Sequence, residues 1–168
     1  IYLLRRPNGD FRLGATLWRL GTLYRRDFLP AEIIRPVLRK LAEDTSETAS
    51  FYVRDGDERI CLYRSNAKRA LRHHLEEGTR LPLDRGAAGR LLLAFSDTSK
   101  TSGDEIRKAG YAVSLGERDP DIGALAVPLI TSEGKCAGAL TVSGPVVRLT
   151  SEMLSESKQM LVSAAQSL

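Results

Sequence analysis

The sequence has few of the side chains on which metal sites and thiol chemistry depend, with two cysteines and two histidines among 168 residues. Cys61 and Cys136 each lie in an apolar, strand-like run, and no CxxC pair is present, so they indicate neither a zinc site nor a disulfide framework. We expect both to be small buried side chains in a reducing cytoplasm. His73 and His74 are adjacent, and neighbours on a strand point to opposite faces, so they cannot share one metal ion. The sequence therefore predicts no metal site.

Long apolar runs and the common catalytic motifs are also absent. No run reaches the roughly eighteen apolar residues that a membrane-spanning helix needs. The sequence contains no G-x-S-x-G, H-E-x-x-H, G-x-x-x-x-G-K or G-x-G-x-x-G. We therefore expect no membrane span, no cofactor and no catalytic residue, which argues against an enzyme.

Charge is distributed unevenly along the chain. Residues 1–40 hold nine Lys and Arg against three Asp and Glu, whereas the remaining residues hold 16 against 18. A basic end on a faintly acidic body indicates that the amino-terminal end lies near a polyanion. An ordinary solvated helix rich in arginine would give the same count, so charge alone does not decide between the two.

The first residues predict a β-hairpin. Asn8-Gly9 lies between the apolar runs 1–4 and 11–13, and this dipeptide favours a type I′ turn, in which both central residues have positive φ. An isolated hairpin is marginally stable in water. Because no element precedes this one, we expect a partner domain upstream of residue 1.

Helical periodicity follows in two segments. Leu17, Leu20, Tyr24 and Phe28 recur at spacings of three and four, with Trp18 alongside, which predicts an amphipathic helix over residues 15–28. A second helix is predicted over residues 30–44, with Pro36 marking either its start or a kink.

The rest of the chain predicts strands and further helices in an irregular order. Asp104 to Ala109 reads as a short helix closed by Gly110, and Thr150 is a good N-cap for a final helix. A buried helix is expected over residues 91–95. The expected strands are residues 49–54, 59–64, 69–75, 111–115, 122–130 and 136–143. This is not a strict βαβ alternation, so the prediction is an α+β fold with an antiparallel sheet.

Two segments are candidates for a binding site. Small residues at Gly86-Ala87-Ala88-Gly89 open a helix, where free N–H groups and the helix dipole favour an anion. Close packing of the helix on the sheet explains the same residues. In the strand that follows Cys136, period two places Thr141 and Ser143 on one face, which suits a pocket wall. A face exposed to water is the alternative.

These segments resemble the IclR family of transcription regulators over essentially the whole chain. Residues 4–14 (LRRPNGDFRLG) are similar to the end of that family's winged helix-turn-helix. The rest of the chain resembles that family's linker helix and effector domain. The stretches that carry this resemblance are residues 35–38 (RPVL), 41–42 (LA), 81–83 (LPL), 86–90 (GAAGR), 109–114 (AGYAVS), 125–128 (LAVP), 141–145 (TVSGP) and 148–150 (RLT).

The resemblance implies a GAF-like effector domain with a six-stranded antiparallel sheet. It implies three parts: the end of the winged helix-turn-helix (1–14), a linker helix (15–28) and the effector-binding domain (29–168). Regulators of this family bind DNA as dimers or dimers of dimers, and a small carboxylate or aromatic acid alters their operator affinity. The DNA-reading helix is not in this sequence, so a homodimer or homotetramer would reach DNA through that missing domain. A dimerisation or scaffold module without a functional ligand is the alternative.

The resemblance also implies which residues contact the effector. Ala87, Ala88 and Gly89 would act as backbone donors, and Thr141 and Ser143 as hydroxyl contacts. Ala124 would be a small wall position. Leu71 and His73 would form the lid, and Glu117 would be the polar partner at the pocket rim. The chain departs from the family pattern at Asp84-Arg85-Gly86, where many members have a His-Ala-Thr type of sequence. Residues 95–110 are also short for the family.

Overall fold

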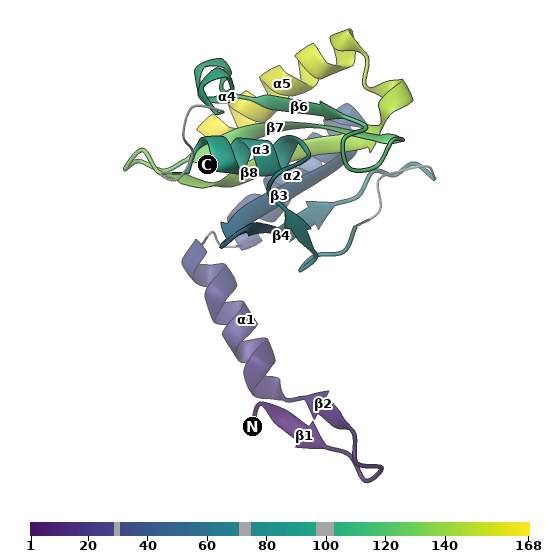
Figure 1. Cartoon of the computed structure of the whole chain (residues 1–168), viewed down its shortest axis with the longest axis vertical. Helices are drawn as coiled ribbons and strands as arrows, with labels where there is room; N and C mark the ends of the chain where they lie inside the picture. Colours follow the sequence, from purple (N-terminus) through teal and green to yellow (C-terminus); the bar gives the residue numbers. More distant parts are fainter. Residues whose placement is uncertain (29–30, 71–74, 97–102) are drawn as a thin grey trace.

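A computed structural model describes residues 1–28, 31–70, 75–96 and 103–168, and it shows a stalk attached to an α+β domain (Figure 1). The stalk consists of a hairpin of β1 (Leu3–Arg5) and β2 (Phe11–Leu13), followed by helix α1 (Ala15–Phe28). Both predicted elements are therefore present, and the helix has the predicted bounds.

The hairpin turn differs from the predicted type. Gly9 has a φ of 92°, but Asn8 does not have a positive φ. Arg6 N–H donates to the carbonyl of Asp10 and Gly9 N–H donates back to Arg6. This is a three-residue loop in which glycine alone takes the left-handed conformation, so the expectation of a type I′ turn was wrong.

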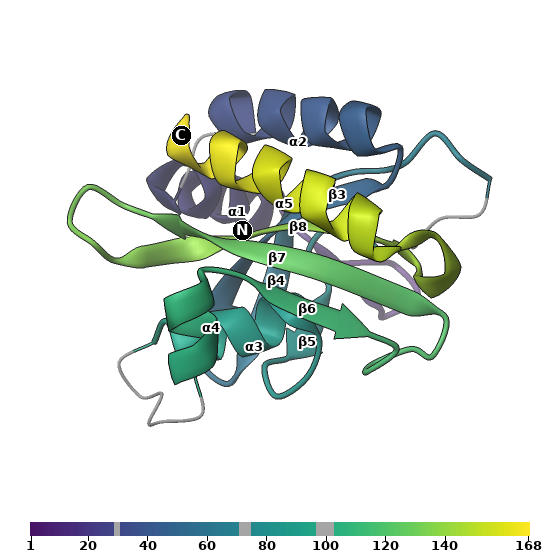
Figure 2. The ribbon, with the colours of Figure 1, turned by 90° about the horizontal axis from the view of Figure 1, so that it is seen from above.

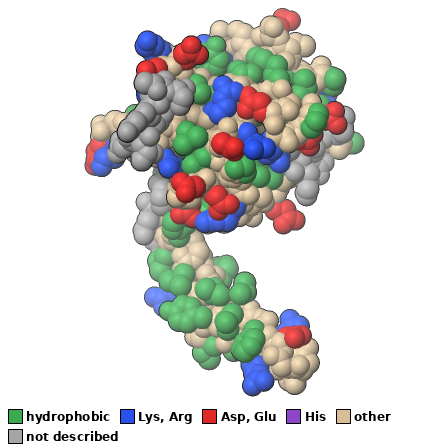
Figure 3. Space-filling model, in the orientation of Figure 1, with side chains coloured by type: hydrophobic (Ala, Val, Ile, Leu, Met, Phe, Trp, Pro, Cys, Tyr) green, Lys and Arg blue, Asp and Glu red, His purple; other side chains and the backbone are tan. Residues whose placement is uncertain are grey.

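The apolar stripe of α1 is exposed. Trp18 is 77% exposed, and Leu20, Leu23 and Tyr24 are also exposed. Figure 3 shows hydrophobic side chains along much of the stalk. The side chain of Phe28, predicted on the same stripe, lies outside the described residues. Helical periodicity thus located the helix, but this apolar stripe does not pack against the other described residues.

The domain is built on one antiparallel sheet in the strand order β5-β4-β3-β8-β7-β6. Every neighbouring pair is antiparallel, which confirms the predicted six-stranded α+β architecture. The strands are β3 (Thr48–Asp55), β4 (Glu58–Ser65), β5 (Arg80–Pro82), β6 (Ala112–Leu115), β7 (Ile122–Ile130) and β8 (Cys136–Pro145).

One predicted strand falls mainly on residues that the structure does not describe. Most of segment 69–75 lies outside the described residues, and its described residues 69, 70 and 75 are not in a strand. The edge of the sheet is formed instead by β5, which pairs with residues 58–60 of β4. Three residues are too few to show a period-two pattern, so this strand could not be predicted from periodicity.

Helices cover both faces of the sheet (Figure 2). α2 (Ala31–Thr45) and α5 (Ser151–Gln166) pack on one face around Leu38, Phe51, Leu140 and Leu161. On the other face, α3 (Ala87–Ala94) and α4 (Asp104–Ala109) lie against a smaller core. The candidate site lies on this second face.

Helix ends follow the local chemistry of the sequence. Thr150 caps α5 by accepting the N–H of Met153, and Gly110 closes α4 with a φ of 76°. Pro36 lies inside α2, which begins at Ala31, so the alternative that Pro36 starts the helix was wrong. Within the described ranges, none of the helices combines the length and apolar composition needed to cross a membrane.

Candidate functional site

Small and hydroxyl side chains form a continuous patch on the second face of the sheet. Ser143 of β8 pairs with Thr48 of β3 on one side and with Ala124 of β7 on the other, and Ala124 pairs with Ser114 of β6. Two residues along β8, Thr141 pairs with Ser50 of β3 and with Ala126 of β7, and its Oγ1 donates to the carbonyl of Ser50. All the hydroxyl residues of the patch are buried. Such a surface binds polar groups better than it packs against apolar ones.

The start of α3 lies opposite this patch. Gly86 precedes the helix with a φ of 78°, and the first hydrogen bond of the helix runs from Arg90 N–H to Gly86. The N–H groups of Ala87 and Ala88 donate to no partner in the described part of the chain. These open donors carry the positive end of the helix dipole.

Arg59 of β4 extends into the same region and is only 4% exposed. Its Nη1 donates to the carbonyls of Pro82 and Arg85, and its guanidinium group lies 5.6 Å from the ring centroid of Tyr52. Its Nε is buried and has no hydrogen-bond partner among the described residues. Burial lowers the pKa of Arg59, as expected for a charged group withdrawn from water.

Two glycines make room for this arginine. A Cβ on Gly89 would overlap Arg59 Nη1 and would come within 2.6 Å of the carbonyl oxygen of Leu83. A Cβ on Gly86 would lie 3.1 Å from Arg59 Nη2. The spacing of these glycines therefore allows close approach of a guanidinium group to the helix start.

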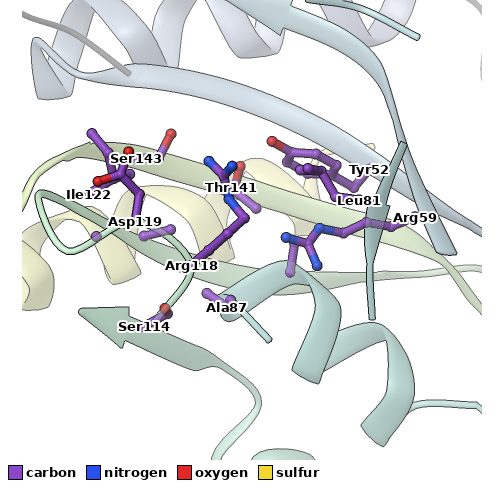
Figure 4. A pocket seen from close by; sticks show the side chains of 14 residues that line it. Tyr52, Arg59, Leu81, Ala87, Ser114, Arg118, Asp119, Ile122, Thr141 and Ser143 are labelled. Carbon is purple, nitrogen blue, oxygen red and sulfur yellow. The ribbon is translucent and has the colours of Figure 1, made fainter. Parts of the chain in front are cut away.

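A cavity lies between the hydroxyl patch, the start of α3 and Arg59 (Figure 4). The volume open to the centre of a water molecule is about 40 Å³. It is lined by residues of the sheet, of the α3 start and of the β6–β7 loop: Tyr52, Arg59, Leu81, Gly86, Ala87, Ala88, Ser114, Arg118, Asp119, Ile122, Gly123, Ala124, Thr141 and Ser143.

Glu117, the ninth predicted site residue, lies in the β6–β7 loop beside Arg118 and is not among the residues that line the cavity. Its Oε2 accepts the N–H of Gly86 over 2.9 Å, and its Oε1 pairs with Arg90. A carboxylate of the chain itself thus occupies one donor at the start of α3, while the next two N–H groups remain open.

The structure brings five of the nine predicted site residues together in the cavity wall: Ala87, Ala88, Ala124, Thr141 and Ser143. Gly89 faces Arg59 and does not line the cavity, so its role is to admit that side chain. Leu71 and His73 lie outside the described residues. The sequence prediction missed Arg59, Arg118 and Tyr52. The one signal for Arg59 was the Gly86/Gly89 pair, which marks a close approach without identifying the group.

A buried polar network continues from Tyr52 away from the cavity. Burial raises the pKa of Tyr52 to about 12 and the pKa of the Cys61 thiol to about 11. Arg64, whose Nη1 donates to Ser50 Oγ, borders the same groups, and its backbone N–H donates to Glu77. The Tyr52 hydroxyl and the Cys61 thiol are therefore neutral at physiological pH, and they can offer hydrogen bonds but no charge.

A second, larger groove lies on the opposite face, between α2 and α5, with a volume of about 400 Å³. It is lined mainly by apolar side chains, with Lys40 and Asp44 at one side.

Among the described residues, no three His, Cys, Asp or Glu side chains are placed to hold a metal ion.

Comparison with known proteins identifies the class as transcription regulators. The chain belongs to the family described as "Bacterial transcriptional regulator IclR C-terminal", whose model matches residues 30–103 and 100–168. Its relatives are named as regulators, and the domain is accordingly a regulatory domain and not an enzyme.

Two curated relatives illustrate the similarity. The HTH-type transcriptional regulator BhcR of Paracoccus denitrificans is 29% identical over 94% of this chain and 66% of its own length. The Pca operon regulatory protein of Acinetobacter baylyi is 30% identical over 73% of this chain and 55% of its own length. The chain thus spans about two thirds, or less, of these relatives.

Solved structures support the same fold. An IclR-family regulator from Rhodococcus sp. matches 98% of the chain with a TM-score of 0.75 and 27% identity. An IclR regulator from Silicibacter sp. matches 99% of the chain with a TM-score of 0.86. At 24% identity, the second similarity concerns the fold alone.

Proposed function

We propose that this chain is the effector-sensing part of an IclR-type DNA-binding regulator, and that a small organic acid in the cavity beside α3 alters the operator affinity of the whole protein. The effector-contacting residues are Ala87 and Ala88 as backbone donors, Thr141 and Ser143 as hydroxyl contacts, and Ala124 as a wall. Glu117 is the rim residue.

The observation that carries this proposal is the environment of Arg59. A buried guanidinium group without a carboxylate partner is costly, because its charge has lost water and gained no counter-ion. Arg59, whose buried Nε has no acceptor among the described residues, lines the same cavity as Ala87 and Ala88, whose N–H groups are open. An acid in that cavity would supply the missing acceptor and the missing charge.

The cavity size limits the effector to a small molecule. A cavity needs about 10–15 Å³ of volume open to the centre of a water molecule in order to hold one water. In the liquid, each water molecule occupies about 30 Å³. A cavity of about 40 Å³ therefore holds roughly three waters, equivalent to a molecular volume of about 90 Å³. This is the size of an acid with three or four carbon atoms.

The stalk would transmit the effector signal. We propose that residues 1–14 complete a DNA-binding domain, that residues 15–28 form a linker helix, and that residues 29–168 form the sensing domain. A second copy of the protein, in a homodimer or homotetramer, would bury the exposed apolar stripe around Trp18. An acid that binds one arrangement of the two stalks more tightly than another shifts the population between them.

Thermal unfolding of the 168-residue chain tests the proposal, with acetate, propionate, lactate, succinate and benzoate as probes. A bound acid at one hundred times its Kd adds about 2.7 kcal/mol, which raises Tm by roughly 5–10 °C. Arg59→Met should abolish the shift, whereas Arg80→Met, on the neighbouring strand and outside the cavity, should retain it. If no acid raised Tm in the wild type, a scaffold module without a ligand would be the better description.

A further inference from the structure

The wall of the cavity that belongs to the sheet carries hydroxyl groups. Ser114 of β6 and Thr141 and Ser143 of β8 line it (Figure 4), and all three side chains are buried. The groups that would hold a carboxylate come from elsewhere, Arg59 from β4 and two open N–H groups from the start of α3. The carbon chain of a bound acid would therefore meet hydroxyl groups, with which an alkyl chain forms no hydrogen bond.

Ser114 contributes a hydroxyl group that has no partner of its own. Its side chain is only 5% exposed, and it lines the cavity. In the part of the chain that the structure describes, its Oγ takes part in no hydrogen bond. Its neighbour in register on β7 is Ala124, whose side chain is a single methyl group. A hydroxyl group that is withdrawn from bulk water without a partner costs free energy, so this position favours an oxygen atom of a ligand.

Thr141 restricts the kind of oxygen that the ligand carries. Its side chain is buried in the cavity wall, and its Oγ1 donates to the carbonyl of Ser50 over 3.3 Å. A hydroxyl group has one hydrogen and two lone pairs, so Oγ1 can still accept a hydrogen bond but has no further hydrogen to donate. A hydroxyl group of the ligand can donate to this oxygen, whereas a keto oxygen would bring lone pairs against lone pairs. Thr141 therefore favours a hydroxy acid over an oxo acid.

The cavity is too small to hold an acid together with its hydration water. Its volume of about 40 Å³ holds roughly three waters, and a three-carbon acid would displace all of them. A ligand that removes ordered water without reproducing its hydrogen bonds loses affinity. The ligand must therefore bring its own hydrogen-bonding group to the hydroxyl wall.

We infer that the effector is a hydroxy acid of three or four carbon atoms, and that Thr141 selects it over the oxo acid and the unsubstituted acid of the same length. This inference rests on the proposed function and specifies its ligand. The carboxylate binds Arg59 and the start of α3, and the hydroxyl group of the ligand donates to Thr141 Oγ1. Ser114, which was not among the predicted site residues, donates to an oxygen atom of the ligand.

The two hydroxyl residues should have different effects on selectivity. Ser114 still has its hydrogen to donate, and a hydroxyl oxygen and a keto oxygen both accept it. Thr141 can only accept, so it pairs with the hydroxy acid alone. Ser114 is thus a residue for affinity, and Thr141 is the residue that determines specificity.

Isothermal titration of the 168-residue chain at pH 8, where all the carboxyl groups are ionised, tests the inference. The probes are D-lactate, L-lactate and 3-hydroxypropionate as hydroxy acids, pyruvate as the oxo acid and propionate as the unsubstituted acid. Because one hydrogen bond is gained and one unpaired group is avoided, the tightest hydroxy acid should bind at least about five times more tightly than pyruvate and propionate. Equal affinities, or tighter binding of pyruvate or propionate, would overturn the inference and leave the proposed function standing. If none of these acids bound, both would fail.

Substitutions in the wall test the role of Thr141. Thr141→Val keeps the shape of the side chain without its oxygen, and it should reduce the preference for the hydroxy acid over pyruvate to below about twofold. Thr141→Ser, which keeps the hydroxyl group, should retain the preference. Ser114→Ala should weaken the binding of both acids by the same factor, so that their ratio stays as in the wild type.

The matched control is Ser157→Ala, which removes a buried hydroxyl group from α5, outside the cavity. It should change neither the affinities nor their ratio. A full preference for the hydroxy acid in Thr141→Val would overturn the inference. The comparison among the acids uses the wild-type chain, so it decides the question even where Thr141→Val fails to fold.

Discussion

The backbone N–H of Gly86 donates to Glu117 Oε2 over 2.9 Å, so a carboxylate from a loop 31 residues away already lies at the start of helix α3. This bond joins the β6–β7 loop to the helix, and the pairing of Glu117 with Arg90 strengthens the connection. The same bond places a negative charge next to the two donors that remain open. Glu117 thus holds the β6–β7 loop against helix α3, and its negative charge opposes the binding of an acid.

The first prediction concerns this opposition. In Glu117→Gln, the amide oxygen can still accept the N–H of Gly86, but the negative charge at the helix start is gone. Because a charge at a helix terminus contributes about 0.3–1 kcal/mol, the affinity for propionate should rise about two- to fivefold. Titration calorimetry measures the change. Glu133→Gln, on an exposed hairpin, is the control with the same charge change, and unchanged or weaker binding in Glu117→Gln would refute the competition.

The second prediction concerns the room that glycine gives to Arg59. Gly89→Ala places a Cβ against Arg59 Nη1 and the carbonyl of Leu83, and such overpacking costs about 1–3 kcal/mol of unfolding free energy. Gly21→Ala, inside α1 with no atom within 4 Å of the new Cβ, should stabilise the chain by about 0.5–1 kcal/mol. Denaturant titration measures both. Equal effects at the two positions would show that Arg59 can move aside at little cost.

The third prediction concerns stability at alkaline pH. The folded-state pKa is about 12 for Tyr52 and about 11 for Cys61, against ordinary values of 10.0 and 9.0. As pH rises above 9, the unfolded chain releases these protons before the folded chain does, so the unfolding free energy falls. At pH 10.5 the loss due to Cys61 is on the order of 2 kcal/mol, and that due to Tyr52 is smaller.

Guanidinium denaturation at pH 8 and pH 10.5 measures this loss. In Cys61→Ala, the unfolding free energy should fall less between pH 8 and pH 10.5 than it does in the wild type. In Tyr52→Phe, it should fall only slightly less than in the wild type. Tyr2→Phe, in the exposed hairpin, should behave as the wild type does. A Cys61→Ala variant with the full loss of stability would show that burial of the thiol is not its cause.

The elements that the sequence predicted well are those with strong local signals. The Thr150 cap, the closing Gly110 and the alternation of Thr141 and Ser143 each depend on a few neighbouring residues, and the structure has all three. The start of α3 was also predicted from local chemistry, since small residues at Gly86-Ala87-Ala88-Gly89 indicated a close approach.

The features that the sequence did not predict depend on contacts between distant segments. Arg59 lies in a hairpin strand where a charged residue is expected to face water, and it is buried because β5 and the α3 start close over it. Arg118 follows Glu117 in a polar loop, and the bonds of Glu117 to Gly86 and Arg90 join that loop to helix α3 beside the cavity. No local periodicity records either relationship.

The last prediction concerns the ion pair between Glu47 and Arg148, which joins the start of β3 to the segment after β8. The Glu47 side chain is only 3% exposed, and Arg148 Nη2 lies 2.8 Å from its Oε2. Arg148→Met leaves a buried carboxylate without its counter-ion, so the unfolding free energy should fall by about 3 kcal/mol or more. Lys40→Met, which breaks an exposed pair with Asp44, should lower the unfolding free energy far less. Denaturant titration compares them, and equal losses would mean that water still reaches Glu47.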